Sequence, residues 1–268
     1  MSSAAPDSAI TQDDHGAARG CLHPLVREFL DVRLADCMEL MASFPDKHFD
    51  LAIVDPPYGI ERFQKGFGTT RFKMDSRTAK DGLKWDNAPS AEYFAELRRV
   101  SKNQIVWGAN YFPSLWEKPC KGFIYWAKSN PVANFADGEM AWTSFDKPAR
   151  QFDYAWGGLS DGVVGRNKKE KSIHPTQKPV GLYSWLLANY AKEGDRILDT
   201  HMGSGSIAIA CHYARLHLTA CEIDHDYFTA SCARIERETA QDSFCFPNVS
   251  AVAPATLDSA LPKDVMAG

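Results

Sequence analysis

Apolar residues along the chain alternate between short β-rich runs and stretches with a helical repeat. The clearest runs predict strands at Phe49–Asp55, Gln104–Gly108, Gly122–Trp126, Arg196–Thr200 and Leu218–Glu222. Apolar positions spaced near the helical period predict helices at 89–101, 178–192, 205–214 and 225–240. Strands that alternate with helices in this way are typical of a mostly parallel sheet, so we expect an α/β protein.

The same pattern divides the chain into a domain and two tails. Residues 1–20 are small, polar and acidic, and residues 246–268 are rich in Ala, Ser and Pro, so both are expected to be flexible. Residues 21–245 are expected to form a single domain. Inside it, the stretches 59–88 and 150–173 have little regular pattern, and loops of that length in a compact domain are commonly functional.

Composition narrows the class of protein. The chain has 268 residues, of which 44% are hydrophobic and 24% charged, which is ordinary for a globular protein. It has no long apolar run and no apolar secretory signal, so we expect no membrane association and a cytoplasmic location. The net charge of -4 argues against non-specific coating of nucleic acid. The 7 cysteines form no CxxC pair, so free thiols and no metal site are expected.

A glycine-containing turn suggests a nucleotide-like ligand. Gly203 and Gly205 stand between a predicted strand that ends near Asp199 and a predicted helix, and the next strand ends at Glu222. The glycines would let the backbone approach a ligand, and Glu222 could accept hydrogen bonds from ribose hydroxyls. A third glycine and a phosphate-binding lysine are missing, which favours an adenosine without a pyrophosphate over NAD or ATP. An ordinary strand–turn–helix connection with a solvated Glu222 is the alternative.

The segment Asp55-Pro56-Pro57-Tyr58 suggests the chemistry. The two prolines stop the preceding strand and stiffen the chain at the carboxyl edge of the sheet. The Asp55 carboxylate and the Pro56 carbonyl are both acceptors, which suits an NH₂ group, and Tyr58 could stack on a planar base. A rigid turn with a helix-capping aspartate is the alternative interpretation.

Together these motifs resemble a known family. DPPY, then HPTQKP at 174–179, DTHMGSGS at 199–206 and CEID at 221–224 are similar in kind and order to the β-group DNA amino-methyltransferases. The resemblance covers roughly residues 30–240 and implies a Rossmann-like methyltransferase fold. Its sheet would be mostly parallel, and its motif order circularly permuted, with the catalytic motif before the cofactor motif. IVWGANYF and GEMAWTSF look like a compact phage and prophage subset, which implies an orphan enzyme in a bacterial or phage-infected cell.

The resemblance implies S-adenosyl-L-methionine as cofactor. The residues that it assigns to cofactor binding are Asp36, His174, Thr176, Lys178, Asp199, His201, Met202, Gly203, Ser204, Gly205, Ser206, Glu222 and Asp224. The chain departs from the family at Thr200-His201, where Pro-Phe is more common. We expect His201 to cover the cofactor as that Phe does.

The implied reaction is methylation of an exocyclic base amine, with Asp55, Pro56, Pro57 and Tyr58 as the catalytic residues. The base must leave the duplex by flipping, after which the amine attacks the methyl group directly. Aspartate before Pro-Pro-Tyr favours adenine N6, by resemblance. Cytosine N4 is the alternative within the class, RNA is a weaker substrate candidate, and Cys120 is expected to be structural. Two alternative functions outside methyl transfer are a catalytically silent DNA-binding regulator and a nicotinamide-dependent oxidoreductase.

Double-stranded DNA is the expected partner. Basic residues gather in the two pattern-poor stretches that we expect to face DNA. They are Arg62, Lys65, Arg71, Lys73, Arg166, Lys168, Lys169 and Lys171. Such side chains bind phosphates without reading sequence, although a solvated surface is an equal alternative. A homodimer is left open, and the sequence identifies no restriction nuclease partner.

Overall fold

The computed structural model describes residues 11–12, 18–19, 22–59, 87–128, 136–154, 173 and 176–240. The strands in these residues are β1 (Thr11–Gln12), β2 (Ala18–Arg19), β3 (Leu30–Leu34), β4 (Phe49–Val54), β5 (Ser101–Trp107), β6 (Phe123–Ala127), β7 (Gly138–Thr143), β8 (Arg150–Asp153), β9 (Arg196–Asp199) and β10 (His217–Glu222). The helices are α1 (Pro24–Arg27), α2 (Cys37–Ala42), α4 (Ala91–Val100), α5 (Val180–Tyr190), α6 (Ser206–Ala214) and α7 (His225–Thr239). Two 3₁₀ turns, η1 (Ala109–Tyr111) and η2 (Pro113–Leu115), follow β5.

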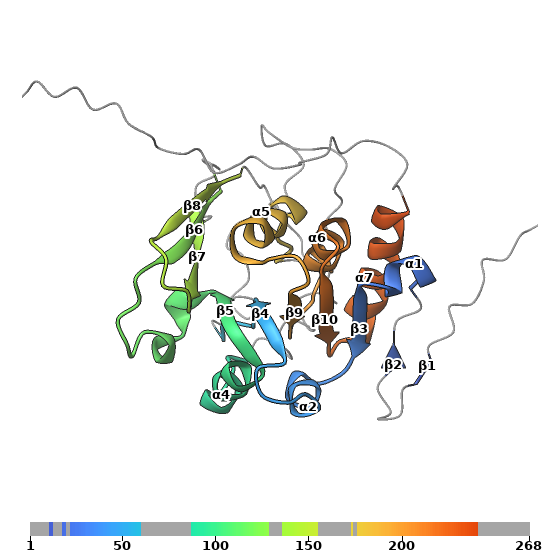
Figure 1. Ribbon diagram of the computed structural model, residues 1–268, viewed down its shortest axis with the longest axis horizontal. Helices are drawn as coiled ribbons and strands as arrows, with labels where there is room; N and C mark the ends of the chain where they lie inside the picture. The colour runs from blue at the N-terminus through green and yellow to red at the C-terminus, as the bar shows by residue number, and fades with distance from the viewer. Residues whose placement is uncertain are drawn as a thin grey trace, which may run out of the picture.

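The described strands form one mixed sheet in the order β1-β2-β3-β10-β9-β4-β5-β7-β6-β8 (Figure 1). Its centre is parallel, because β3, β10, β9, β4 and β5 pair in the same direction. Antiparallel pairing occurs at both ends, where β7 joins β5 and β6, and β2 joins β3. The sheet is therefore mostly parallel, and the fold is Rossmann-like, as predicted.

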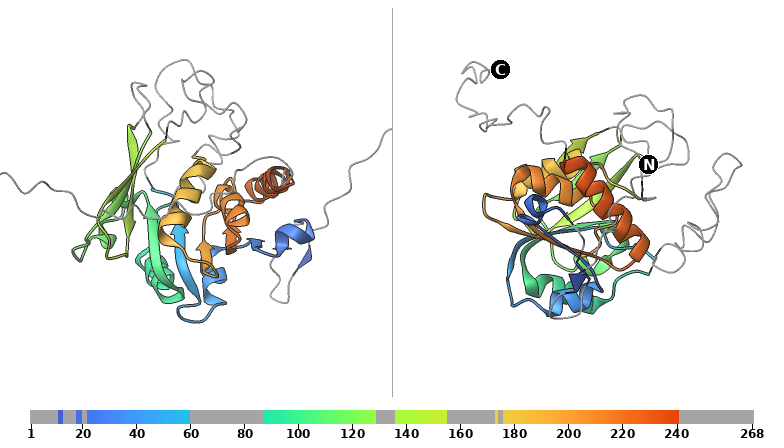
Figure 2. Two further views of the ribbon diagram at one scale, coloured as in Figure 1. Left: turned by 45° about the horizontal axis from the view of Figure 1, so that its top comes forward. Right: turned by 90° about the vertical axis from the view of Figure 1, so that its right-hand side faces the viewer.

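Helices cover both faces of the parallel centre. The helices α5, α6 and α7 lie on one face, and α2 and α4 lie on the other, as Figures 1 and 2 show. Strand β4 shows why both faces are covered: Leu51 and Ile53 pack into one core, while Ala52 and Val54 pack into the other. Each fully buried Leu or Ile contributes roughly 1.5–3 kcal/mol, so a strand with apolar residues on both faces is stable only between two layers.

The chain reverses its direction of travel between β4 and β9, which are neighbours in the sheet. From β4 it passes through α4 to β5. From β9 it passes through α6 to β10, which lies on the other side of the β4–β9 pair, and α6 covers the face of the sheet opposite to α4. A crevice opens at the carboxyl ends of strands at such a switch point, and ligands of open α/β sheets bind there. The motif that ends β4 and the motif that ends β9 are therefore brought together, although they are far apart in sequence.

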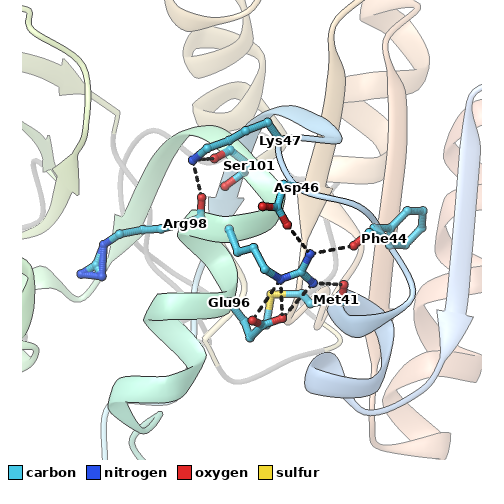
Figure 3. Close-up of polar contacts among 8 residues, drawn as sticks. Met41, Phe44, Asp46, Lys47, Glu96, Arg98 and Ser101 are labelled. Atoms are coloured by element: carbon cyan, nitrogen blue, oxygen red, sulfur yellow. Dashed lines mark hydrogen bonds and ion pairs between the residues drawn. The ribbon is translucent and has the colours of Figure 1, made fainter.

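The amino edge of the same strands is tied by polar contacts to the loop before β4 (Figure 3). The Arg99 guanidinium donates to the carbonyls of Met41 and Phe44 and to the carboxylates of Asp46 and Glu96, at 2.9–3.0 Å. Lys47 donates its Nζ to the carbonyls of Arg98 and Ser101, at 2.5 and 3.1 Å. These contacts join α2, the following loop and α4, and we call them the Arg99 cluster.

The predicted strands and helices are confirmed, with boundaries that shift by one to three residues at their ends. Among the helices and strands described for the domain, five had no expected counterpart: α1, β3, α2, β7 and β8. The prediction that 150–173 lacks regular structure is wrong at its start, because Arg150–Asp153 pairs with β6. Residues 1–20 were predicted to be a tail, yet β1 and β2 extend the sheet from β3. The described residues contain no helix with the length and apolar character to cross a membrane.

Candidate active site at the carboxyl edge of the sheet

Acidic side chains gather where the parallel strands end. Asp36 follows β3, Glu222 ends β10, Asp199 ends β9 and Asp55 follows β4. Since these strands are adjacent and parallel, their carboxyl ends meet at one edge. The structure thus brings together the catalytic motif and the cofactor motif that the sequence predicted separately.

Asp55 and Tyr58 contact each other directly. The Tyr58 hydroxyl donates to Asp55 Oδ1 at 2.7 Å, and burial together with the Asp55 charge raises the pKa of Tyr58 well above its usual value. Tyr58 is therefore a hydrogen-bond donor at any physiological pH. Pro56 is buried and Pro57 partly buried, so the turn that carries both side chains is packed into the protein.

The Tyr58 ring fits against the turn after β5. Gly108 has a φ of +69°, and a Cβ at this position would lie 2.1 Å from Tyr58 Cε1, so the ring occupies the space of the missing side chain. The Tyr111 ring stacks on Tyr58, with centroids 4.9 Å apart and planes inclined by 18°. Tyr111 is 42% exposed, and no sequence motif marked it as part of the site.

Lys178 contacts the catalytic motif through its side chain. Its Nζ forms an ion pair with Asp55 Oδ2 and lies 3.1 Å from Glu139 Oε2, although the Lys178 side chain is only 3% exposed. Lys128 Nζ contacts the other Glu139 oxygen at 2.5 Å. We call Asp55, Lys178, Glu139 and Lys128 the Lys178 cluster. Glu139, on β7, has no local motif that marks it as functional.

The charges of this cluster are stabilised by one another. Burial alone would lower the pKa of Lys178, but the carboxylates of Asp55 and Glu139 outweigh it and raise that pKa. Burial also works to raise the pKa of Glu139, yet the ammonium groups of Lys178 and Lys128 hold it at about 2. Both groups are therefore ionised near neutral pH.

Both glycines of the turn from β9 to α6 adopt a left-handed backbone conformation. Gly203 and Gly205 have φ of +53° and +74°. The Gly203 N–H donates to Glu222 Oε2 at 2.9 Å, and the Asp224 N–H donates to Glu222 Oε1 at 3.0 Å. Glu222 thus fixes the turn and its own loop, and each of its oxygens retains a lone pair for a further donor.

Gly205 has a packing role besides its backbone conformation. A Cβ there would lie 3.0 Å from the terminal methyl of Ile235 on α7, so a side chain would press α6 away from α7. The absence of a side chain at Gly205 therefore also allows α6 and α7 to pack closely. Ser206 begins α6 and donates its hydroxyl to the backbone carbonyl of Lys178 at 2.7 Å. The buried Arg234 donates to Ser206 Oγ at 2.9 Å and to the Ser204 carbonyl at 2.8 Å.

Asp199 is buried, His201 is half-buried, and both have shifted pKa values. Burial raises the pKa of Asp199 to about 8, although the His201 N–H donates to its carboxylate at 3.0 Å. Burial lowers the pKa of His201 to about 4, so its ring is neutral near pH 7. Thr200 Oγ1 lies 2.9 Å from His201 Nδ1 and 2.6 Å from the Tyr93 hydroxyl, so Thr200 orients the ring.

The other predicted cofactor residues differ in position. Asp36 and Asp224 cap α2 and α7, where each carboxylate accepts two backbone N–H groups. The buried Met202 donates its N–H to the Cys221 carbonyl at 2.9 Å. Thr176 is exposed just before the buried Lys178. His174 lies outside the described residues, as do all eight basic residues expected to contact DNA.

Comparisons with known proteins find similarity to DNA methyltransferases. Residues 123–232 match the model of a family described as DNA methylase, for adenine N6 and cytosine N4. The chain is 27% identical to the type II methyltransferase M2.MboI of Moraxella bovis over 65% of this chain and 76% of that protein. It is 23% identical to the type II methyltransferase M2.DpnII of Streptococcus pneumoniae over 76% of this chain and 88% of that protein.

A solved structure shows the same fold. The cytosine-N4-specific PvuII DNA methyltransferase superposes with a TM-score of 0.50 and 15% identity, over 79% of this chain and 90% of that one. A permuted α/β sheet with an aspartate and a glycine turn at its switch point is the arrangement expected of a methyltransferase. The chain is similar to the DNA amino-methyltransferases of the N6/N4 type, in the family match and in both relatives.

Proposed function

We propose that the protein transfers a methyl group from S-adenosyl-L-methionine to the N6 amine of an adenine flipped out of double-stranded DNA. The single observation that supports this most strongly is the position of Asp55. Its carboxylate stands at the switch point, beside the β9–α6 turn, with one oxygen held by Tyr58 and the other by Lys178.

The residues of the β9–α6 turn fit this cofactor. The left-handed conformation at Gly203 and Gly205 opens the turn, and the N-terminal N–H groups of α6 suit a carboxylate such as that of the methionine moiety. Glu222 retains acceptor capacity for ribose hydroxyls at the end of β10. When bound, S-adenosyl-L-methionine supplies an electrophilic methyl carbon attached to a sulfonium sulfur. We assign Asp36, His174, Thr176 and His201 to the same cofactor by resemblance.

The chain's own contribution to the reaction is positioning and electrostatics. Asp55 and the Pro56 carbonyl accept the two amine hydrogens, which aims the nitrogen lone pair at the methyl carbon. Tyr58 presents a ring for the flipped base, and Tyr111 supports that ring from behind. Holding the acceptors rigid avoids reorganisation as positive charge develops on the amine nitrogen. The reaction forms no covalent bond between enzyme and base.

The choice of adenine rests on the resemblance of the DPPY motif. Cytosine N4 is the second candidate, because its amine offers the same two hydrogens to the same acceptors. The structure of the catalytic turn suits either base.

The test is to express the chain in a bacterial host that has no DNA base methylation of its own. Genomic DNA is digested to nucleosides, and methylated nucleosides are quantified by mass spectrometry, with Asp55→Ala as the matched control. N6-methyladenine that is absent with Asp55→Ala is the expected result. N4-methylcytosine would correct the base, and equal methylation by Asp55→Ala would overturn the mechanism.

A further inference from the structure

The Lys178 cluster places a buried cation between two carboxylates, of which only one belongs to the catalytic motif. Lys178 Nζ is 3.1 Å from Glu139 Oε2 and also pairs with Asp55 Oδ2. The Lys178 ammonium lies 5.4 Å from the centre of the ring of Trp107, the last residue of β5. The side chains of Asp55 and Glu139 are 16% and 25% exposed, whereas that of Lys178 is 3% exposed, so the lysine is the most buried member of the three.

Stability gives no reason for this arrangement. Removing a lysine from water costs several kcal/mol, and apolar residues of similar volume commonly replace buried ion pairs without loss of stability. Cofactor binding accounts for it poorly as well, because the ammonium is directed at Asp55 and Glu139. A function that needs the cation beside Asp55 explains why the cost is tolerated.

The charge states decide between two such functions. If Lys178 and Glu139 relayed the product proton, one of them would have to take up a proton near neutral pH. The pKa of Glu139 is held at about 2 by Lys178 and Lys128, and the pKa of Lys178 is raised by both carboxylates. Lys178 therefore keeps its proton, and Glu139 does not accept one. The cluster holds its charges constant, which suits a positioning role.

We propose that Lys178 and Glu139 are positioning residues that fix the Asp55 carboxylate for the target amine. This inference rests on the proposed function. Tyr58 holds Oδ1 and Lys178 holds Oδ2, while Glu139 holds Lys178 in place. Each Asp55 oxygen then retains a lone pair in a fixed direction, toward which an amine N–H can point.

The reaction balances without a change at Lys178. The amine nitrogen forms a bond to the methyl carbon as the bond from carbon to sulfur breaks, and sulfur takes the electron pair. The extra proton on nitrogen passes to Asp55 and then to water. Lys178 is an ammonium before and after, so it contributes position and charge only.

The test compares Lys178→Met, Glu139→Gln and Asp55→Asn in single-turnover methyl transfer at saturating cofactor and DNA. The dissociation constant of S-adenosyl-L-methionine is measured in parallel by calorimetry, which also shows that each variant is folded. We expect a loss of about 100-fold in rate for Lys178→Met and about 10-fold for Glu139→Gln, as is typical of lost positioning. Cofactor affinity should stay within about 3-fold, because neither side chain is directed at the cofactor turn.

A double variant separates positioning from general disruption. If Lys178 acts through Asp55, Lys178→Met should cost little further rate in the Asp55→Asn background. Lys102→Met is the matched control, since Lys102 pairs with Asp50 at 2.6 Å on the amino side of the same strands, and its rate should be unchanged.

Two results would overturn the inference and leave the proposed function intact. One is weaker cofactor binding with an unchanged saturated rate in Lys178→Met, which would make Lys178 a cofactor ligand. The other is a full additional loss in the double variant. Full activity of Asp55→Asn would instead refute the proposed function itself.

Discussion

The two edges of the sheet use the same interaction for different purposes. At the amino edge, the Arg99 side chain contacts the carboxylates of Asp46 and Glu96 and is 29% exposed. At the carboxyl edge, Lys178 contacts two carboxylates and is 3% exposed. Arg99 also donates to the backbone carbonyl of Met41, in α2, and to that of Phe44, in the loop that follows α2. Its contacts therefore join elements of the fold. In the contacts described above, the Lys178 side chain donates to no backbone carbonyl. The two carboxylates that it contacts lie in the candidate site.

This difference distinguishes a charged cluster that stabilises the fold from one that serves the candidate site. Arginine with five donors suits carbonyl oxygens of loop ends, and partial exposure keeps its desolvation cost low. A buried lysine has a high desolvation cost and is retained where a fixed positive charge is needed. We therefore expect variants at the carboxyl edge to change the rate of methyl transfer and variants at the amino edge to change stability.

The largest effect is expected from Asp55→Asn. The amide keeps the size of the side chain but loses the charge and one acceptor, so the single-turnover rate should fall about 100- to 1,000-fold. Rapid-quench measurement of labelled methyl transfer checks this, with S-adenosyl-L-methionine affinity measured alongside. A loss that disappears at higher cofactor concentration would contradict a role in the chemical step.

The next effect is expected from Gly108→Ala. The new Cβ would lie 2.1 Å from Tyr58 Cε1, so the ring must move away from Asp55. Overlap and strain should cost about 3 kcal/mol of unfolding free energy, and the rate should fall at least about 10-fold. Gly194→Ala is the matched control, because Gly194 has a φ of +81° with open space around its Cβ position. Denaturant titration of both variants separates overlap from backbone strain; equal losses would rule out the overlap.

A smaller, pH-dependent effect is expected from Asp199→Asn. Burial raises the pKa of Asp199 from 3.8, its ordinary value, to about 8, so the folded protein keeps this proton up to about pH 8. The stability that this group contributes is therefore complete below about pH 4 and is lost as the pH rises through about 8.

Asparagine does not titrate, so Asp199→Asn should become more stable relative to the parent as the pH rises through this range. We expect a relative gain of about 4 kcal/mol between pH 5 and 9, measured by thermal unfolding at each pH. Parallel stability curves for the two proteins would show that Asp199 is ionised when folded.

The smallest effect is expected from Arg99→Met. Loss of partly exposed hydrogen bonds should lower the free energy of unfolding by about 1–2 kcal/mol. The rate per folded molecule should stay unchanged, because the cluster lies at the amino edge. Arg98→Met is the control, since Arg98 donates to the Phe94 carbonyl at a longer 3.3 Å. A reduced rate in Arg99→Met at temperatures where it is fully folded would remove the distinction between the edges.

Much of the fold could be predicted because its central strands and helices have strong local patterns. Strand β4 and helix α6 are almost wholly apolar and are bounded by prolines or glycines. β7 was missed because it is antiparallel and contains Glu139, and its GEMAWT sequence does not alternate as a half-buried strand does. The short helix α2 has too few residues for a detectable period, although Asp36 caps it.

The candidate site was predicted in its parts, and its central contact was not. The DPPY motif and the glycine turn are local patterns with a known chemistry, and the fold brings them to one edge. The pair of Lys178 and Asp55 joins residues 123 positions apart, and Glu139 reaches Lys178 from a third segment. No local pattern encodes such a contact, so Lys178 could be assigned only by resemblance.

The most direct test of the central claim is transfer of a labelled methyl group by the purified protein. The protein is incubated with methyl-labelled S-adenosyl-L-methionine and mixed-sequence double-stranded DNA, and the labelled nucleoside is identified after digestion. The account predicts label on an exocyclic base amine with the parent chain, and almost none with Asp55→Asn at equal cofactor occupancy. No label on DNA despite measured cofactor binding, or label on a ring carbon, would contradict it.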